Sequence, residues 1–227
     1  MSLAALTTLP LLALLSACDP GPSPGAEVTL ESDVQKASYS IGRNIAASLE
    51  EIDDQLDLPA ILRGVSDGLA GIESPLAQEE LVAAETAFQQ MLMDAQAAEA
   101  ATTMVQGEAF LAENGNREGV VTTASGLQYE VLQEGDGASP EAGQQVQVHY
   151  RGTLIDGTEF DSSFGGEPAS FNLNGVIEGF GEAIMLMRVG GRVRAYIPSA
   201  LGYGASASSR IPANSVLIFE IELLGIG

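Results

Sequence analysis

The feature that most limits the possible folds of this chain is one long helical stretch without a break. Ser74-Pro75 provides a helix start, and neither Gly nor Pro occurs from Leu76 to Gln106. The sequence predicts a helix from Leu76 to Gly107 that can extend to Asn114, about 38 residues or about 57 Å. Such a helix is longer than a compact small domain, so we expect it to connect two bodies. Its apolar stripe is thin and consists of Leu81, Ala84, Phe88, Met91, Ala95, Ala98 and Val105.

Two shorter helices are expected before the long one. The first has Ser32 as its N-cap, and the second begins at Leu58-Pro59 and ends at Gly71. Two helices of this size bury too little apolar surface for a core of their own. Pairing with a second copy of the chain would cover that surface, so we expect a homodimer. An unrelated acidic helical hairpin is the alternative. The apolar positions at helical spacing are Val34, Ala37, Ile41, Ile45 and Leu49, followed by Ile61, Leu62, Val65 and Leu69.

The start of the chain is typical of an export signal. Residues 1–17 are apolar, and the segment is too short for a membrane span, although no Lys or Arg precedes it. Leu15-Ser16-Ala17-Cys18 resembles the bacterial lipobox, in which a signal peptidase cuts before the cysteine and the thiol receives a lipid. The alternative is a plain cleaved signal that leaves a free thiol. Residues 18–30 are rich in Pro and Gly, which is typical of a flexible tether.

The export signal and lipobox predict a location in the bacterial cell envelope. We expect the protein to face the periplasm, with Cys18 as the lipidation site that anchors it to the inner or the outer membrane. The folded parts would then be held away from the membrane by the tether.

Charge and residue counts exclude several classes of function. The net charge is −22, from 31 acidic and 9 basic residues, and such a chain repels the phosphates of nucleic acids. Residues 19–124 hold 19 acidic and 4 basic side chains, whereas residues 125–227 hold 12 and 5. The single Cys cannot form an intrachain disulfide, and the single His, His149, gives no metal-ligand spacing. We therefore expect no metal, no cofactor and no nucleic-acid partner.

Beyond Gly115 the hydrophobic period changes from that of a helix to that of strands. Alternating segments predict a sheet, and Asp156-Gly157 is a hairpin turn signal between two of its strands. Only Ile177 to Met187 is expected to be helical. Together these features predict an antiparallel sheet with one short helix, and an α+β chain as a whole. The expected strands lie within Leu127–Leu132, Gln145–Gly152, Arg192–Ile197 and Ser215–Leu224.

Five blocks of this region resemble the FKBP-type peptidyl-prolyl cis/trans isomerases in order and spacing. They are Val148-His149-Tyr150-Arg151-Gly152, Phe160-Asp161-Ser162-Ser163, Val176-Ile177-Glu178-Gly179-Phe180, Leu201-Gly202-Tyr203-Gly204 and Val216-Leu217-Ile218-Phe219-Glu220. The resemblance implies a sheet wrapped around a short helix, with an apolar pocket between them, in residues 116–227. Ser38-Tyr39-Ser40-Ile41-Gly42 resembles the macrophage infectivity potentiator type of this family. That likeness implies a helical dimerisation domain and long connecting helix over residues 31–115.

The implied reaction explains why no reactive side chain is needed. Rotation about an X–Pro bond meets a barrier of about 18–20 kcal/mol, set by amide resonance. A dry aromatic pocket favours the rotated, less polar amide over the planar one. The resemblance implies that Tyr203 donates its hydroxyl to the substrate carbonyl and that Asp161 supports the pocket edge. General-base catalysis by Asp161 is disfavoured, because no proton moves. The implied substrate-binding residues are Tyr150, Phe160, Val176, Ile177, Phe180, Ile211 and Phe219.

The implied substrates are proline-containing polypeptides that are unfolded or partly folded, and the implied role is folding of exported proteins. The alternative is a holdase chaperone in which isomerisation is secondary. Three departures from the family pattern concern the pocket rim and floor. Ala169 stands where an aromatic residue is common, Arg210 where an aliphatic one is common, and Phe180 where Trp is frequent. His149 is expected on the strand face opposite Tyr150.

Overall fold

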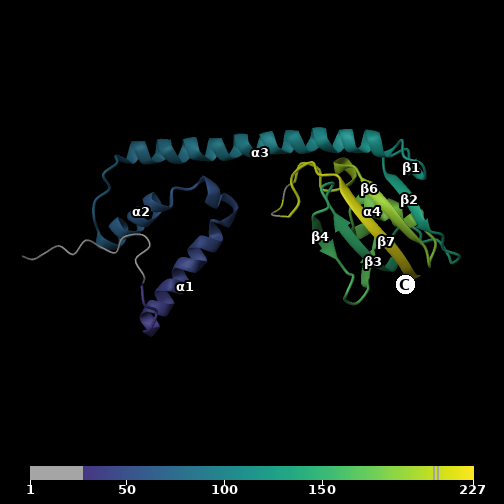
Figure 1. The fold of residues 1–227 in the computed structure, drawn as a ribbon, viewed down its shortest axis with the longest axis horizontal. Helices are drawn as coiled ribbons and strands as arrows, with labels where there is room; N and C mark the ends of the chain where they lie inside the picture. The colour runs from purple at the N-terminus through teal and green to yellow at the C-terminus, as the bar shows by residue number, and fades with distance from the viewer. Residues whose placement is uncertain (1–27, 207, 209) are drawn as a thin grey trace, which may run out of the picture. The chain divides into compact units, whose positions relative to one another are not determined.

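The computed structural model describes residues 28–206, 208 and 210–227. The expected export signal, Cys18 and most of the tether therefore lie outside the described residues. The chain divides after Ala77 into two compact units, which are described separately below (Figure 1).

The N-terminal unit contains α1 (Asp33–Ser48), the 3-10 helix η1 (Glu50–Gln55) and α2 (Leu58–Ala70). Ser32 caps α1 through a capping box, since its hydroxyl accepts from the Gln35 N–H and the Gln35 side chain accepts from the Ser32 N–H. Gly71 ends α2 in the left-handed conformation, at φ 66°. Both predicted helices are confirmed, whereas η1 was not predicted.

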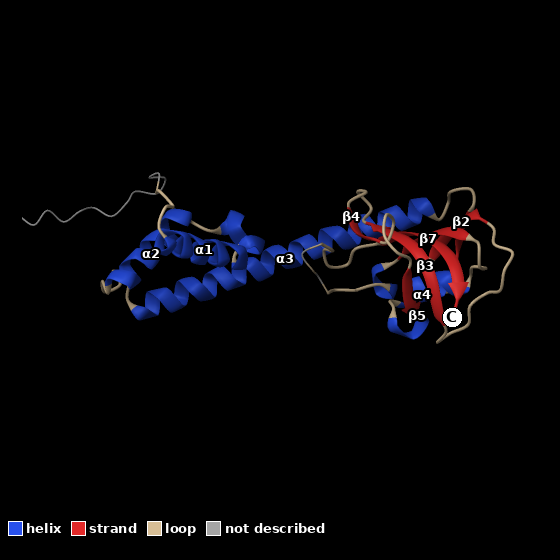
Figure 2. Ribbon diagram, turned by 90° about the horizontal axis from the view of Figure 1, so that it is seen from below, coloured by secondary structure: helices blue, strands red, loops and turns tan. Residues whose placement is uncertain are grey.

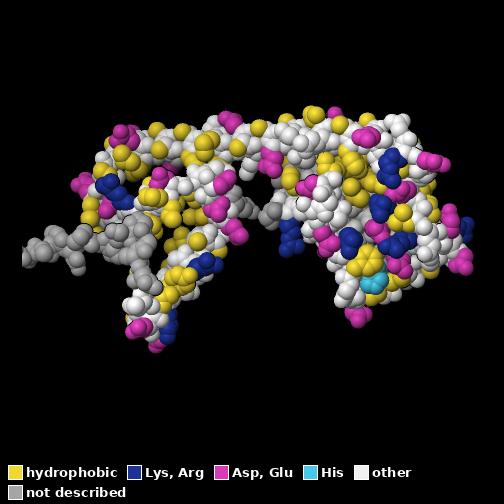
Figure 3. All heavy atoms as spheres, viewed as in Figure 1, with side chains coloured by type: hydrophobic (Ala, Val, Ile, Leu, Met, Phe, Trp, Pro, Cys, Tyr) yellow, Lys and Arg dark blue, Asp and Glu magenta, His cyan; other side chains and the backbone are white. Residues whose placement is uncertain are grey.

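The helices α1 and α2 bury none of their residues within the described chain. Figure 3 shows apolar side chains on the visible surface of this unit. Large apolar side chains of α1 and α2 are exposed to an extent that is unusual for the surface helices of a monomeric protein. For example, Ile41 is 61% exposed and Leu69 is 86% exposed. The apolar surface of the unit is therefore left without a partner. Its other large exposed members are Val34, Tyr39, Ile45, Leu58, Leu62 and Val65.

The second unit begins with α3 (Gln78–Asn114), which confirms the long helix and its extension to Asn114. A seven-stranded antiparallel sheet follows, in the order β1-β2-β6-β7-β3-β4, with β5 also paired to β3 (Figure 2). The predicted α+β fold is thereby confirmed. The strands are β1 (Val120–Thr122), β2 (Gln128–Gln133), β3 (Gln145–Thr153), β4 (Glu159–Ser162), β5 (Ala169–Asn172), β6 (Arg192–Ile197) and β7 (Leu217–Ile226).

The core lies between the sheet and α4 (Glu178–Met185), which packs against β6 and β7. Close approach of the helix requires Gly179, because a Cβ there would lie 2.4 Å from Cγ2 of Ile197. Two further 3-10 turns, η2 (Leu173–Gly175) and η3 (Ser199–Leu201), flank this region. The largest fully buried side chains are Leu127, Val146, Val148, Ile184, Ile197, Leu217, Ile221 and Leu223.

The outer face of the sheet carries an ion-pair network, and basic and acidic side chains are mixed over this face in Figure 3. Glu130 accepts from Arg117, Arg194 and the hydroxyl of Tyr196, at 3.2, 3.0 and 2.7 Å. Burial alone would raise the pKa of Glu130, but the Tyr196 hydrogen bond and the two arginines outweigh it and lower the pKa. Through Arg117, which lies just after the end of α3, the network attaches the chain to Glu130 on β2 and to Tyr196 on β6.

No helix within the described ranges has the combination of length and hydropathy that a membrane span needs.

Candidate functional site

The inner face of β3 forms one side of the candidate site. Val146, Val148, Tyr150 and Gly152 alternate along this strand and face α4, because successive side chains point to opposite faces. His149 lies on the other face, where its ring stacks on Phe164 with centroids 5.4 Å apart.

Five aromatic rings meet at the inner face of the sheet. Phe180, on α4, lies 5.0 Å from the ring centroid of Phe219 on β7 and 5.9 Å from that of Tyr150. Phe160, on β4, contacts Phe219 edge-on at 5.5 Å. Most of these contacts have the edge-to-face geometry that aromatic pairs prefer. The structure thus brings together four of the residues singled out in the sequence, on three strands and one helix.

The fifth ring, Phe171 on β5, was missed by the sequence reasoning. It lies 5.6 Å from Tyr150 and 5.8 Å from Phe180. Ala169 and Phe171 are two residues apart on one strand, so they share a face. Ala169 was already singled out as a rim position, so strand alternation from Ala169 could have pointed to Phe171 as a second residue that faces the site.

A short polar pair marks the edge of this cluster. The Tyr150 hydroxyl donates to Oδ2 of Asp161 at 2.6 Å, and Oδ1 of Asp161 accepts from the Ser162 N–H at 2.9 Å. Burial is the main cause that raises the pKa of Tyr150, followed by the hydrogen bond to Asp161 and the charge of that carboxylate. The phenol therefore stays protonated around neutral pH and remains a donor to Asp161.

The remaining sequence-predicted residues lie around the same cluster. Val176, Ile177 and Ile211 are partly buried against the core, and Ile177 is the N-cap of α4. Tyr203 is 49% exposed and lies close enough to Tyr150 to contribute to the raised pKa of the Tyr150 phenol. Arg210 donates from Nη1 to the Phe160 carbonyl at 3.4 Å, so the segment after Tyr203 reaches across to β4.

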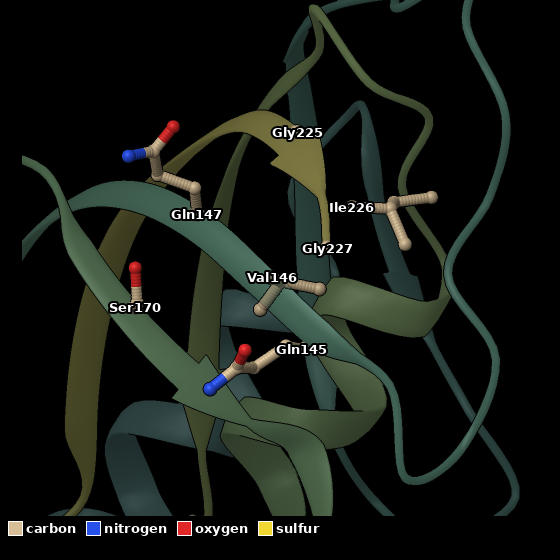
Figure 4. A pocket seen from close by; sticks show the side chains of 7 residues that line it. All are labelled: Gln145, Val146, Gln147, Ser170, Gly225, Ile226 and Gly227. Atoms are coloured by element: carbon tan, nitrogen blue, oxygen red, sulfur yellow. The ribbon is translucent and has the colours of Figure 1, made fainter.

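A separate hollow of about 250 Å³ lies at the other end of β3 (Figure 4). It shares no residue with the aromatic cluster, and its walls are amide, hydroxyl and aliphatic side chains and glycine backbone rather than rings. We assign it no role in the chemistry. Its lining consists of Gln145, Val146, Gln147, Ser170, Gly225, Ile226 and Gly227.

The geometry suits a reaction that needs a low-polarity surface with one or two hydrogen-bond donors at its edge. Phe160, Phe180 and Phe219 are at most 7% exposed and have no charged group among them. Such a surface disfavours a planar, well-solvated amide relative to its rotated form, since the rotated form loses charge separation. The fold and this cluster are those that an isomerase of the X–Pro peptide bond would need.

Comparison with known protein families also indicates a peptidyl-prolyl isomerase. Residues 34–131 match the domain amino-terminal to FKBP-type peptidyl-prolyl isomerase, and residues 137–224 match the FKBP-type peptidyl-prolyl cis-trans isomerase domain. This chain belongs to the FKBP-type peptidyl-prolyl cis-trans isomerase family.

Similar proteins span almost the whole chain. The FKBP-type peptidyl-prolyl cis-trans isomerase FkpA of Aeromonas hydrophila is 43% identical over 222 residues, which is 92% of this chain and 82% of that protein. The outer membrane protein MIP of Legionella longbeachae is 36% identical over 87% of this chain and 88% of its own length. The crystal structure of FkpA from Escherichia coli has a TM-score of 0.65 at 36% identity and covers 86% of this chain and 97% of that one.

Proposed function

We propose that this protein isomerises X–Pro bonds in exported polypeptides and so assists their folding in the bacterial cell envelope. The observation that carries the proposal is the cluster of five rings around Phe180, with the Tyr150–Asp161 pair at its edge. A proline ring would be desolvated against Phe180, Phe160 and Phe219. Rotation of its amide would then proceed without transfer of a proton or formation of a covalent bond.

Within this proposal the two polar residues have different roles. Tyr203 is exposed enough to reach the carbonyl of a bound peptide, and its hydroxyl donates a hydrogen bond to it. Asp161 fixes the Tyr150 ring, and thus one wall of the pocket, through the 2.6 Å hydrogen bond. Val176, Ile177 and Ile211 form the apolar rim that contacts the residues flanking proline.

Removing either polar group should lower activity without unfolding the domain. In the chain from Ala26 onward, Tyr203→Phe and Asp161→Ala are each expected to reduce kcat/KM on an X–Pro peptide by about three- to tenfold, the value of one hydrogen bond. Tyr39→Phe removes a hydroxyl from an exposed tyrosine of α1 and should leave kcat/KM unchanged. Wild-type kcat/KM in both site variants would contradict the assigned roles.

We further propose that the helical unit, residues 31–77 with part of α3, joins two copies of the chain. Support comes from the unpartnered apolar surface of α1 and α2 and from the match of residues 34–131 to the amino-terminal domain of this family. We place the isomerase domain in residues 116–227, as the sequence predicted, with α3 as the connection.

The proposed membrane anchor is a lipid on Cys18, after cleavage of residues 1–17. Support comes from the lipobox-like Leu15-Ser16-Ala17-Cys18 and from the envelope location in the printed name of the Legionella relative. Cys18→Ser is expected to abolish incorporation of a palmitate label and to move the protein from the membrane to the soluble fraction. Ser23→Ala, in the same tether, should keep label and location. A Cys18→Ser protein that still carries the label would refute the anchor.

A further inference from the structure

The last turns of α3 are packed against the isomerase domain rather than leading freely into it. Asn114 is 2% exposed and donates to Oε1 of Gln128 at 2.8 Å, and Gln128 in turn donates to the Leu111 carbonyl at 2.8 Å. Gly107 lets the helix lie close to Val216, the residue before β7, because a Cβ on Gly107 would be 2.8 Å from Cγ2 of Val216. The C-terminal part of α3 and the sheet are thus held together by packing and by paired amide hydrogen bonds.

One residue joins this helix to the segment that carries two site residues. The Asn214 side chain donates from Nδ2 to the Ala100 carbonyl of α3 at 3.2 Å. Its backbone N–H donates to the Gly204 carbonyl at 2.7 Å. Gly204 directly follows Tyr203, and Ile211 lies three positions before Asn214. Asn214 therefore closes the base of the loop between Tyr203 and Ile211 and attaches that base to α3.

The backbone of Asn214 fits this double role. Among the described residues it is the only one other than glycine with a positive φ, at 63°. Asparagine tolerates this left-handed conformation better than most residues, but glycine would adopt it at less cost. Conformation alone would thus favour glycine at this position, but glycine has no side chain to donate to the Ala100 carbonyl, as the asparagine amide does.

We propose that Asn214 is a positioning residue that links the Tyr203 segment to α3. In this proposal α3 contributes to catalysis by the isomerase domain, in addition to connecting that domain to the helical unit. Tyr203 is half-exposed, so its direction depends on how its own loop is held. The tie to α3 limits the positions of the Tyr203 hydroxyl over the aromatic cluster. The inference rests on the role proposed above for Tyr203.

The test is a double-mutant cycle in the chain from Ala26 onward. Asn214→Gly keeps the positive φ and the N–H bond to Gly204 and removes only the amide. It should lower kcat/KM on an X–Pro peptide by about three- to tenfold, and by less than about twofold when Tyr203 is already Phe. Asn116→Gly is the matched control, because it removes an equivalent amide bond to an α3 carbonyl, that of Ala112. It should change kcat/KM in neither background.

A second measurement does not depend on activity. With fluorotyrosine incorporated, the 19F resonance of residue 203 should shift or broaden in Asn214→Gly and stay unchanged in Asn116→Gly. An equal loss of kcat/KM in both Tyr203 backgrounds, or an unchanged resonance, would overturn the inference. If Tyr203→Phe alone has wild-type activity, the proposed role of Tyr203 fails, and the resonance alone decides whether Asn214 holds that side chain.

Discussion

Gly152→Ala is expected to reduce kcat/KM on an X–Pro peptide by about 10- to 100-fold. A Cβ at Gly152 would lie 2.6 Å from Cε2 and Cζ of Phe160 and 2.9 Å from Cε1 of Phe219. Both rings belong to the aromatic cluster, so the added methyl group requires at least one of them to shift. Overpacking of this kind costs about 1–3 kcal/mol. If that cost raises the free energy of the bound transition state, it lowers the rate by about 5- to 160-fold, a span that includes the expected reduction.

Two measurements separate this effect from global unfolding. Circular dichroism should show a folded protein, with a Tm lower by about 2–12 °C. Gly225→Ala is the matched control, since Gly225 also lies in a strand and an added Cβ there would meet no atom within 4 Å. It should leave kcat/KM and Tm close to wild type. A fully active Gly152→Ala protein would show that Phe160 and Phe219 do not line the reacting site.

Ile41→Glu and Leu62→Glu are each expected to convert a dimer into a monomer. Both side chains belong to the apolar surface of α1 and α2, where they are 61% and 42% exposed in a single chain. A carboxylate buried without a partner in an interface costs several kcal/mol, so the dissociation constant should rise by about a thousandfold or more. Multi-angle light scattering on the chain from Ala26 onward measures the mass directly.

The control for the dimer prediction is Ala47→Glu. It introduces the same charge into the same helix, at an exposed position on the side away from Ile41 and Ile45. This variant should remain a dimer. A wild-type protein that is a monomer at micromolar concentration would contradict the proposed pairing, and a dimeric Ile41→Glu protein would place the interface elsewhere.

Local signals in the sequence were sufficient for most elements. The N-cap at Ser32, Gly71 after the second helix and the stretch without Gly or Pro from Leu76 to Gln106 can all be recognised in the sequence, so the sequence alone predicts these helices. Strand alternation predicted β3, because the inner face of this strand is buried, and a long, mostly apolar segment predicted β7. The short β1 and the 3-10 helix Glu50–Gln55 were not predicted, since three to six residues give too little periodicity.

The candidate site was predictable only in part, for a different reason. The family motifs contain Tyr150, Phe160, Phe180 and Phe219, but Phe171 lies outside them and reaches the cluster through the pairing of β5 with β3. The Tyr150–Asp161 bond and the contact of Asn214 with Ala100 join residues 11 and 114 positions apart. Such contacts depend on how the elements pack, and no local pattern in the sequence encodes them.

The central claim is that the protein catalyses rotation of the X–Pro bond. The most direct test is two-dimensional exchange NMR on a short proline peptide, with and without the chain from Ala26 onward. Uncatalysed exchange takes tens of seconds or more, so cross-peaks between cis and trans forms should appear within a second only when active protein is present. Gly152→Ala should weaken them strongly. Exchange no faster than that of the peptide alone would contradict the account.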